Sequence, residues 1–143
     1  MIDTKSVEVA RKEITRASKP AIVKAQDDAF NRKILEYGRF DVLFSVEAGE
    51  RKNSLKKIDS GFNHVLADIA TKNNVAIGIN LEEIHELSEG EKAERLAKVR
   101  NVIETCRKSK TKLVINGNKK AGFHFLLSLG ASSSQAKEAT QYF

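Results

Sequence analysis

Apolar residues along the chain recur at two spacings, one typical of amphipathic helices and the other of short buried strands. Helical spacing runs through four segments, 7–17, 28–37, 62–72 and 88–106. Nearly continuous apolar runs lie at 21–25, 40–46, 75–81 and 112–116. Helices that alternate with strands favour parallel strands joined by crossover helices. Four strands are too few for a closed eight-stranded barrel, so the pattern predicts an α/β fold, either a small layered structure or an incomplete barrel.

Capping signals place the ends of these predicted helices. Asp27 can cap the second helix, and Gly38 is well placed to end it in the left-handed conformation. Asn73 or Asn74 can end the third helix in the same way. Ser88, with a glutamate three residues later, forms a capping box that opens the long fourth helix.

Two further predictions concern burial and the end of the chain. The third helix is expected to bury one apolar face, which consists of Phe62, Val65, Leu66, Ile69 and Ala70. Residues 123–129 and 134–142 are predicted to form short helices, although the first of these segments could also be a strand.

The composition bounds the class of protein. With 143 residues, of which 41% are hydrophobic and 31% charged, the chain fits one soluble domain covering residues 1–143. No apolar run approaches the ~20 residues that span a bilayer. The start lacks the apolar core of a secretory signal, so we expect no membrane association and a cytoplasmic location. The lone Cys106 excludes an intramolecular disulfide, and its helical spacing from Val99 and Ile103 predicts a small core residue.

Positive charge is concentrated in one part of the sequence. The net charge is +6, and the span between Glu104 and Glu138 contains no acidic residue. Seven basic residues fall in that span, namely Arg107, Lys108, Lys110, Lys112, Lys119, Lys120 and Lys137. A local excess of cations favours polyanions such as nucleic acids, because binding releases counterions. The alternative is a solvated lysine-rich face, as in proteins from hot environments.

Several basic residues are candidates for contacts to phosphates. His64 lies in the first turn of the third helix, away from its apolar face, where free backbone N–H groups favour an anion. Arg32 points away from the apolar stripe of its own helix. Residues 47–60 form a predicted loop with four basic side chains, which are Arg51, Lys52, Lys56 and Lys57.

A second predicted loop, residues 116–120, follows the fourth strand. It ends in Lys119 and Lys120 and lies at the carboxyl end of a parallel strand, where α/β proteins place their sites. Amide and lysine side chains suit contacts to RNA sugar and phosphate. Aromatic residues are sparse, at 6%, so recognition of backbone and shape is favoured over base stacking.

No motif indicates that the protein itself is catalytic. Phosphate-binding loops, dinucleotide fingerprints and nucleophile elbows are absent from the sequence. The three histidines are far apart, so no metal centre is predicted. Three carboxylates cluster after the third strand, namely Glu82, Glu83 and Glu86. Acidic residues before a helix are more often dipole partners or solvated charges than catalytic groups.

The third helix and the strand after it carry a motif that resembles a known family. The motif reads Gly61, Phe62, Asn63-His64-Val65-Leu66-Ala67, two asparagines, Val75-Ala76-Ile77 and Leu81. This order is similar to that in protein component 3 of archaeal and eukaryotic ribonuclease P, and the resemblance covers roughly residues 20–142. It implies a non-catalytic protein with an incomplete TIM-barrel-like (polymerase-histidinol-phosphatase-like) fold. Such a protein helps a catalytic RNA to remove the 5′ leader from precursor tRNA.

The resemblance also implies partners and contacts. The partners would be ribonuclease P RNA, precursor tRNA and protein component 2, with Mg²⁺ serving the RNA and no cofactor bound by the protein. Family RNA contacts match Arg32, Arg51 and His64, and Lys119 and Lys120 lie near the position of the family's last basic loop. The family has a longer amino-terminal part, so this chain is expected to be a shortened form whose barrel is open or completed by a partner.

Two other functions fit parts of the sequence. The run 112–120 fits an RNA-binding module of the kink-turn-recognising ribosomal class, in which helices sandwich a sheet of mixed strand order. A small metal-dependent phosphoesterase would share the barrel-like fold but lacks an evident set of metal ligands. A tight complex with a kink-turn RNA would favour the first alternative, and hydrolysis of phosphate esters by the pure protein would favour the second.

Overall fold

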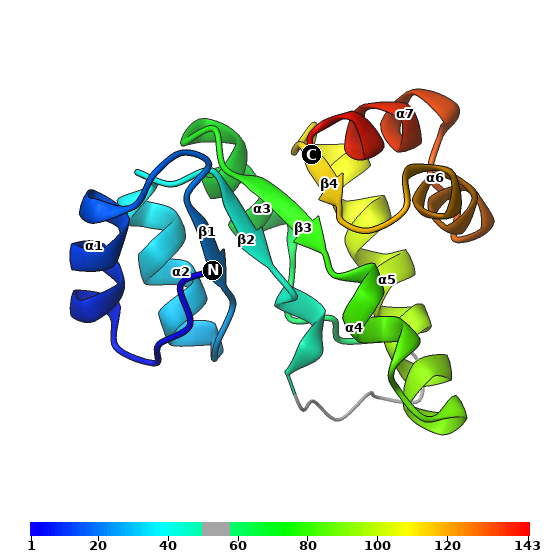
Figure 1. Ribbon diagram of the computed structural model, residues 1–143, viewed down its shortest axis with the longest axis horizontal. Helices are drawn as coiled ribbons and strands as arrows, with labels where there is room; N and C mark the ends of the chain where they lie inside the picture. Colours follow the sequence, from blue (N-terminus) through cyan, green and yellow to red (C-terminus); the bar gives the residue numbers. More distant parts are fainter. Residues whose placement is uncertain (50–57) are drawn as a thin grey trace.

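Four parallel strands form one sheet in the computed structural model, which describes residues 1–49 and 58–143 (Figure 1). The strands are β1 (Ile22–Lys24), β2 (Val42–Phe44), β3 (Ala76–Ile79) and β4 (Leu113–Ile115). Their order in the sheet is their order in the chain, and each neighbouring pair is parallel. The predicted α/β class with parallel strands and crossover helices is confirmed. The sequential order agrees with an incomplete barrel and differs from the mixed order of the kink-turn class.

Helices connect the strands and extend the structure beyond both ends of the sheet. Their bounds are α1 (Val7–Arg16), α2 (Asp28–Tyr37), α3 (His64–Lys72), α4 (Leu81–His85), α5 (Glu89–Ser109), α6 (Lys119–Ser128) and α7 (Ser133–Gln141). A short 3-10 helix, η1 (Val46–Ala48), follows β2. In Figure 1, α1 and α2 lie at the β1 end of the sheet, and α6 and α7 lie at the β4 end. No helix in the described ranges has both the length and the apolar character needed to cross a membrane.

The predicted capping residues lie at the helix ends, as expected. Asp27 Oδ1 accepts a hydrogen bond of 2.8 Å from an amide in the first turn of α2, and Gly38 ends that helix with a φ of 68°. Asn74 takes the left-handed position after α3, with a φ of 56°. Ser88 Oγ lies 3.4 Å from the amide nitrogen of Glu91 and caps α5. Local side-chain chemistry therefore fixes most of the helix boundaries.

One helix, α4, was not predicted, and another, α6, begins earlier than the apolar spacing predicts. Leu81, which the spacing places in the third strand, opens α4 because Asn80 Oδ1 accepts a hydrogen bond from the Glu83 amide at 3.2 Å. Lys119, predicted to lie in a loop, opens α6 because Asn118 Oδ1 accepts from a first-turn amide at 2.9 Å. Asparagine caps thus set both starts, and residues 123–128 are helical rather than extended.

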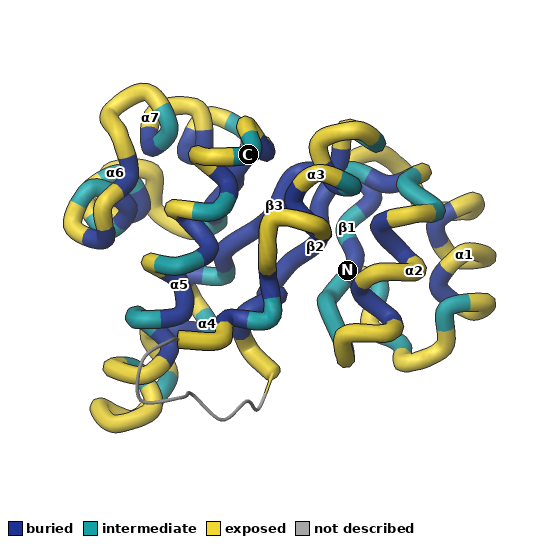
Figure 2. Tube along the Cα trace, turned by 180° about the vertical axis from the view of Figure 1, so that it is seen from behind, coloured by how far each residue is buried: buried dark blue, intermediate teal, exposed yellow. Residues whose placement is uncertain are grey.

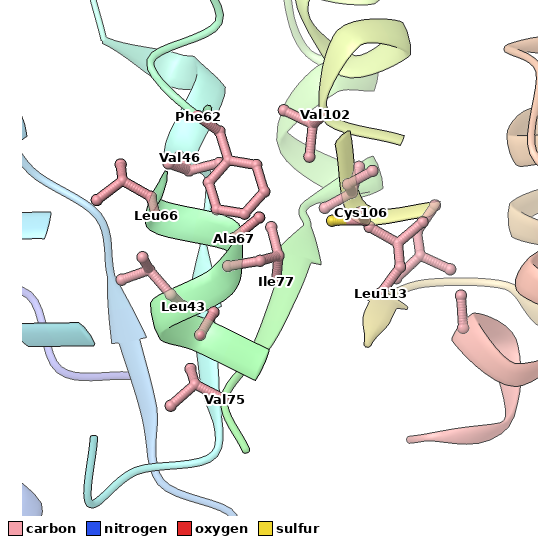
Figure 3. Packing of buried hydrophobic residues seen from close by; sticks show 14 of the residues in the cluster. Leu43, Val46, Phe62, Leu66, Ala67, Val75, Ile77, Val102, Cys106 and Leu113 are labelled. Atoms are coloured by element: carbon pink, nitrogen blue, oxygen red, sulfur yellow. The ribbon is translucent and has the colours of Figure 1, made fainter. Parts of the chain in front are cut away.

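Side chains on successive strand residues alternate between the two faces of the sheet. One register row consists of Val23, Leu43, Ile77 and Leu113. These four residues are buried in a single core cluster that also contains residues of the flanking helices. Figure 3 shows Leu43 and Ile77 beside Leu66 and Ala67 of α3, with Cys106 of α5 close to Leu113. Cys106 is a fully buried core residue, as predicted, and burial raises the pKa of its thiol.

The opposite face of the sheet holds a smaller apolar cluster near the end of the chain. It is formed by Val42, Phe44, Ala76 and Val114, and Tyr142 packs against it. The ring of Phe143 stacks on that of Phe44, with 6.0 Å between the ring centroids. Figure 2 shows the buried strands between helices whose outer sides are exposed. Both faces of the sheet are therefore covered, one by helices and the other partly by the last two residues.

The burial predicted for the third helix is wrong at one position. Val65 is 40% exposed, whereas Leu66, Ala67 and Ala70 are buried. The helix begins only at His64, so the buried Phe62 precedes it and does not mark its inward face. The inward stripe of α3 consequently consists of Leu66, Ala67 and Ala70.

Gly78 of β3 is a position where a larger side chain should destabilise the fold. A Cβ atom there would lie 2.8 Å from side-chain carbons of Val42 and Phe44. Gly78→Ala should therefore lower the free energy of unfolding by about 1–3 kcal/mol, as measured by urea denaturation. Gly90 in the first turn of α5 is the control, since nothing lies within 4 Å of the position that an added Cβ would occupy. Gly90→Ala should be neutral or slightly stabilising, and equal losses of stability in the two variants would contradict the packing argument.

Candidate nucleic-acid interface

Two asparagines tie together the carboxyl ends of β3 and β4. Asn116 Nδ2 donates to Asn80 Oδ1 at 2.9 Å, and Asn116 Oδ1 accepts from the Leu81 amide at 2.8 Å. Asn80 Oδ1 in turn caps α4. Each amide side chain therefore satisfies a backbone group or its partner amide, which holds the chain rigidly where it leaves the two strands.

Lys119 and Lys120 lie directly beyond this amide pair, in the first turn of α6. The chain reaches them through Gly117, whose φ of 88° favours glycine, and through the cap residue Asn118. Both lysines are exposed. The amino end of a helix already carries partial positive charge, and the two lysines add to it rather than neutralise it. This combination favours an anion at the carboxyl end of β4.

Arg32 and the start of α3 form a second candidate region. Arg32 lies on the exposed side of α2, where its Nε is 3.1 Å from Glu36 Oε1. It lines a groove of about 340 Å³ together with Asn63 and Val65, and two aspartates also line this groove. His64 is the first residue of α3 and is exposed. The structure thus brings Arg32 close to the helix that begins with His64, although the charge of Arg32 is already partly balanced.

The predicted contact residues do not all lie in one described region. Lys119 and Lys120 are at the β4 end of the sheet, whereas α2, which carries Arg32, is at the β1 end (Figure 1). Arg51, Lys52, Lys56 and Lys57 lie outside the described residues. Among the described residues, the predicted contacts therefore form two separate groups, one beside α3 and the other at the start of α6.

A buried group of charges lies at the carboxyl ends of β2 and β3, and sequence reasoning missed it. Arg95 of α5 donates from Nε to Glu47 Oε1 at 3.0 Å and from Nη2 to Glu83 Oε1 at 2.7 Å. The Glu47 side chain is fully buried, that of Arg95 is 9% exposed and that of Glu83 is 31% exposed. We call these three residues the Arg95 network. It joins η1, α4 and α5.

Burial of Glu47 is the dominant electrostatic feature of the Arg95 network. Removal from water raises the pKa of Glu47, and the attraction of Arg95 offsets only part of this effect. Its second oxygen, Oε2, has no hydrogen-bond partner among the described residues. The network therefore depends on Arg95, because that guanidinium makes the ionic contact that compensates the buried carboxylate.

The sequence did contain a signal for this network. Arg95 lies four residues before Val99, on the same helical stripe as the buried apolar residues of α5. Lys98 is also buried, and its Nζ lies 3.6 Å from Glu94 Oε1. Charged residues at inward positions of a helix are rarely buried without a partner. Their position on the stripe therefore pointed to ion pairs inside the protein, although not to the identity of Glu47.

Two of the three carboxylates after β3 have roles within the fold. Glu82 and Glu83 lie in the first turn of α4, where acidic residues interact favourably with the helix dipole, and Glu83 also pairs with Arg95. Within residues 1–49 and 58–143, no group of three or more His, Cys, Asp or Glu residues is arranged to hold a metal ion.

Comparisons with known proteins identify relatives of this chain. No family model matches the sequence. Ribonuclease P protein component 3 of Methanococcus vannielii is 30% identical over 94 residues, which are 66% of this chain and 38% of that protein. A chain in the cryo-EM structure of archaeal ribonuclease P with mature tRNA shares the fold with a TM-score of 0.81 at 24% identity.

The structural match covers almost the whole of this chain. It includes 99% of this chain and 64% of the matched chain, so the protein spans only part of the length of both relatives. The sequence match carries the family relationship, and the structural match shows the same fold. The sequence match therefore indicates a relationship to ribonuclease P protein component 3.

Proposed function

We propose that this chain is an RNA-binding, non-catalytic protein subunit of ribonuclease P, which supports RNA-catalysed removal of the 5′ leader from precursor tRNA. The observation that carries the proposal is the 30% identity to ribonuclease P protein component 3 over 94 residues. The basic character of the chain, with a net charge of +6, fits a partner rich in phosphate. The chemistry of cleavage would belong to the RNA and its Mg²⁺ ions.

The mechanism that we propose is electrostatic. Lys119 and Lys120 would contact RNA phosphates together with the free N–H groups at the start of α6. The hydrogen bonds between Asn80 and Asn116 would hold this helix start in place. Neutralised phosphates allow RNA strands to approach one another, so the protein would lower the Mg²⁺ concentration that the folded RNA needs. Arg32 and His64 would contribute a second group of contacts beside α3.

The proposed partners are ribonuclease P RNA, precursor tRNA and protein component 2. Support for the RNA partners comes from the relative in archaeal ribonuclease P with mature tRNA. The pairing with component 2 rests on the family relationship. The outer edge of β1 is only partly covered, by hydrogen bonds between Ile2 and the backbone of Ile22 and Lys24. A partner subunit that pairs with this edge would extend the sheet.

The proposal is tested by charge reversal in a reconstituted enzyme. One variant carries Lys119→Glu and Lys120→Glu, a second carries Arg51→Glu and Lys52→Glu, and a third combines all four. Each pair should weaken RNA binding roughly tenfold and make the slope of log K against log salt shallower by about 0.7–0.9 for each phosphate that the variant no longer neutralises. Leader removal at limiting Mg²⁺ should fall in both paired variants and fall further in the variant that combines all four substitutions.

A matched control distinguishes a contact from a change in total charge. Lys5 and Lys12 are exposed near α1, at the β1 end of the sheet, whereas Lys119 and Lys120 lie at the β4 end. The pair Lys5→Glu and Lys12→Glu should leave RNA binding unchanged. Equal activity of all variants in the reconstituted enzyme would reject the proposal. Metal-stimulated hydrolysis of phosphate esters by the pure protein would favour a phosphoesterase, and a tight stoichiometric complex with a kink-turn RNA would favour the ribosomal class.

A further inference from the structure

A groove lies at the amino end of β4, between the end of α5 and the start of α7. Its volume is about 450 Å³. The polar residues that line it include Arg107, Lys110, Lys112, Ser132, Ser134 and Glu138. We call it the α5–α7 groove. It is at the opposite end of β4 from Lys119 and Lys120. Its basic lining residues, Arg107, Lys110 and Lys112, all belong to the span between Glu104 and Glu138 that contains no acidic residue.

The three cations of the α5–α7 groove are exposed. Arg107, Lys110 and Lys112 form no ion pair with any described carboxylate. Arg107 donates from Nη1 to the carbonyl oxygen of Gly130, which orients its guanidinium beside the turn between α6 and α7. The Nζ of Lys112 lies 5.1 Å from the centroid of the Tyr142 ring. Two of the cations are thus held in place by neutral partners.

The amino end of α7 adds hydrogen-bond donors to this groove. Ser132 Oγ accepts from the Gln135 amide at 3.1 Å and caps the helix. Gln135 Nε2 donates to the carbonyl oxygen of Ile103 at 3.1 Å, which fixes the start of α7 against α5. The amides of the first turn remain without helical partners and carry the positive end of the helix dipole. Glu138, one turn further along α7, is the carboxylate among the described lining residues.

Lys110 adopts a backbone conformation that favours a different residue. Its φ is 56°, in the left-handed region, where lysine costs about 1–2 kcal/mol more than glycine. This conformation ends α5 and turns the chain into β4, so that Arg107 and Lys112 line the same groove on either side of it. The turn at Lys110 therefore places three cations around one groove.

We infer that the α5–α7 groove binds a phosphate group of an RNA backbone and forms a contact region separate from the start of α6. The inference rests on the proposed function, because that function supplies RNA as the polyanion. The ligand is recognised by its charge through Arg107, Lys110 and Lys112, and by hydrogen bonds from the first turn of α7. No base is read by this arrangement, so binding here is independent of sequence.

The test compares charge removal in the groove with charge removal elsewhere. The groove variant carries Lys110→Asn and Lys112→Gln, since asparagine tolerates the left-handed conformation. The control carries Lys5→Gln and Lys12→Gln, and the reference carries Lys119→Gln and Lys120→Gln. Binding of ribonuclease P RNA is measured at several salt concentrations, with thermal unfolding as the check of folding. The groove variant should bind roughly tenfold more weakly, with a slope shallower by about 1–2.

The possible results separate this inference from the proposed function. If the groove variant binds like the control while the Lys119 and Lys120 variant is weakened, the inference is overturned and the proposed function stands. If the native protein does not bind the RNA, both are overturned. Binding of a polyglutamate peptide that is abolished in the groove variant, with unchanged RNA binding, would assign the groove to an acidic protein and also overturn the inference. In the native protein, NMR signals of the Ser133 and Ser134 amides should shift on addition of a short oligoribonucleotide.

Discussion

Replacing Arg95 with methionine should lower the free energy of unfolding by about 3–5 kcal/mol at neutral pH. Arg95 makes the ionic contact to Glu47, whose side chain is fully buried. Its loss would leave an uncompensated carboxylate in the core, and Glu47 Oε2 already has no described partner. Glu83 is 31% exposed and can be solvated, so the cost should come mainly from Glu47. Urea denaturation of the native and variant proteins measures the difference.

The dependence of this loss on pH follows from the pKa of Glu47. Burial raises that pKa in the folded protein above the ordinary value of 4.5, and removal of Arg95 should raise it further. A carboxyl group with a raised folded pKa contributes stability below its unfolded pKa, and this contribution is lost as pH rises through the folded value. The destabilisation of Arg95→Met should therefore grow as pH rises through the folded pKa of Glu47 in the native protein, which lies above 4.5.

A second substitution provides the control for the Arg95 network. The double variant Glu47→Leu and Arg95→Met replaces the ion pair by apolar side chains and should recover most of the lost stability. It should also lose the pH dependence that the single variant shows. A single Arg95→Met variant as stable as the native protein at neutral pH would show that Glu47 is not a compensated charge.

Gly38→Ala should destabilise the protein by about 2–4 kcal/mol, which combines backbone strain with a steric clash. Gly38 ends α2 with a φ of 68°, and a Cβ atom there would lie 2.7 Å from the Cβ of Asn73. Asn73 cannot easily move aside, because its Nδ2 donates to the Leu35 carbonyl oxygen at 2.7 Å. The substitution would push α2 and α3 apart, and the RNA contacts proposed for Arg32 and His64 should weaken with it. Thermal unfolding measures the loss of stability.

Gly130 offers a matched control for this clash. Its φ is 98°, so alanine is strained there as well, but nothing lies within 4 Å of the position of an added Cβ. Gly130→Ala should cost only the strain, about 1–2 kcal/mol. If Gly38→Ala and Gly130→Ala are equally stable, the contact with Asn73 has no energetic weight at the junction of α2 and α3.

The sequence predicted those parts of the fold that depend on local chemistry. The alternation of helical and strand-like apolar segments predicted the parallel α/β arrangement, and Asp27, Gly38 and Ser88 marked helix ends. Errors arose where two signals overlapped. The apolar run through Leu81 continued past the true end of β3, because the cap at Asn80 overrides the tendency of the run to stay extended.

Contacts between distant segments could not be predicted in the same way. Glu47 and Arg95 are 48 residues apart, and nothing in the local sequence of Glu47 distinguishes it from an exposed loop residue. The candidate RNA contacts have the same difficulty, because Arg32 and Lys119 occupy opposite ends of the sheet only through the strand order. Charge patterns indicated which residues are basic, whereas the topology determines which of them lie together.

The positions of residues 2 and 143 have a practical consequence. Ile2 is hydrogen-bonded along the outer edge of β1, and the Phe143 ring stacks on Phe44, on the face of the sheet that carries the smaller apolar cluster. An affinity handle fused to either terminus would start at an ordered contact and could displace it. Internal labels at exposed sites such as Lys12 are therefore the better choice for pull-down or fluorescence work.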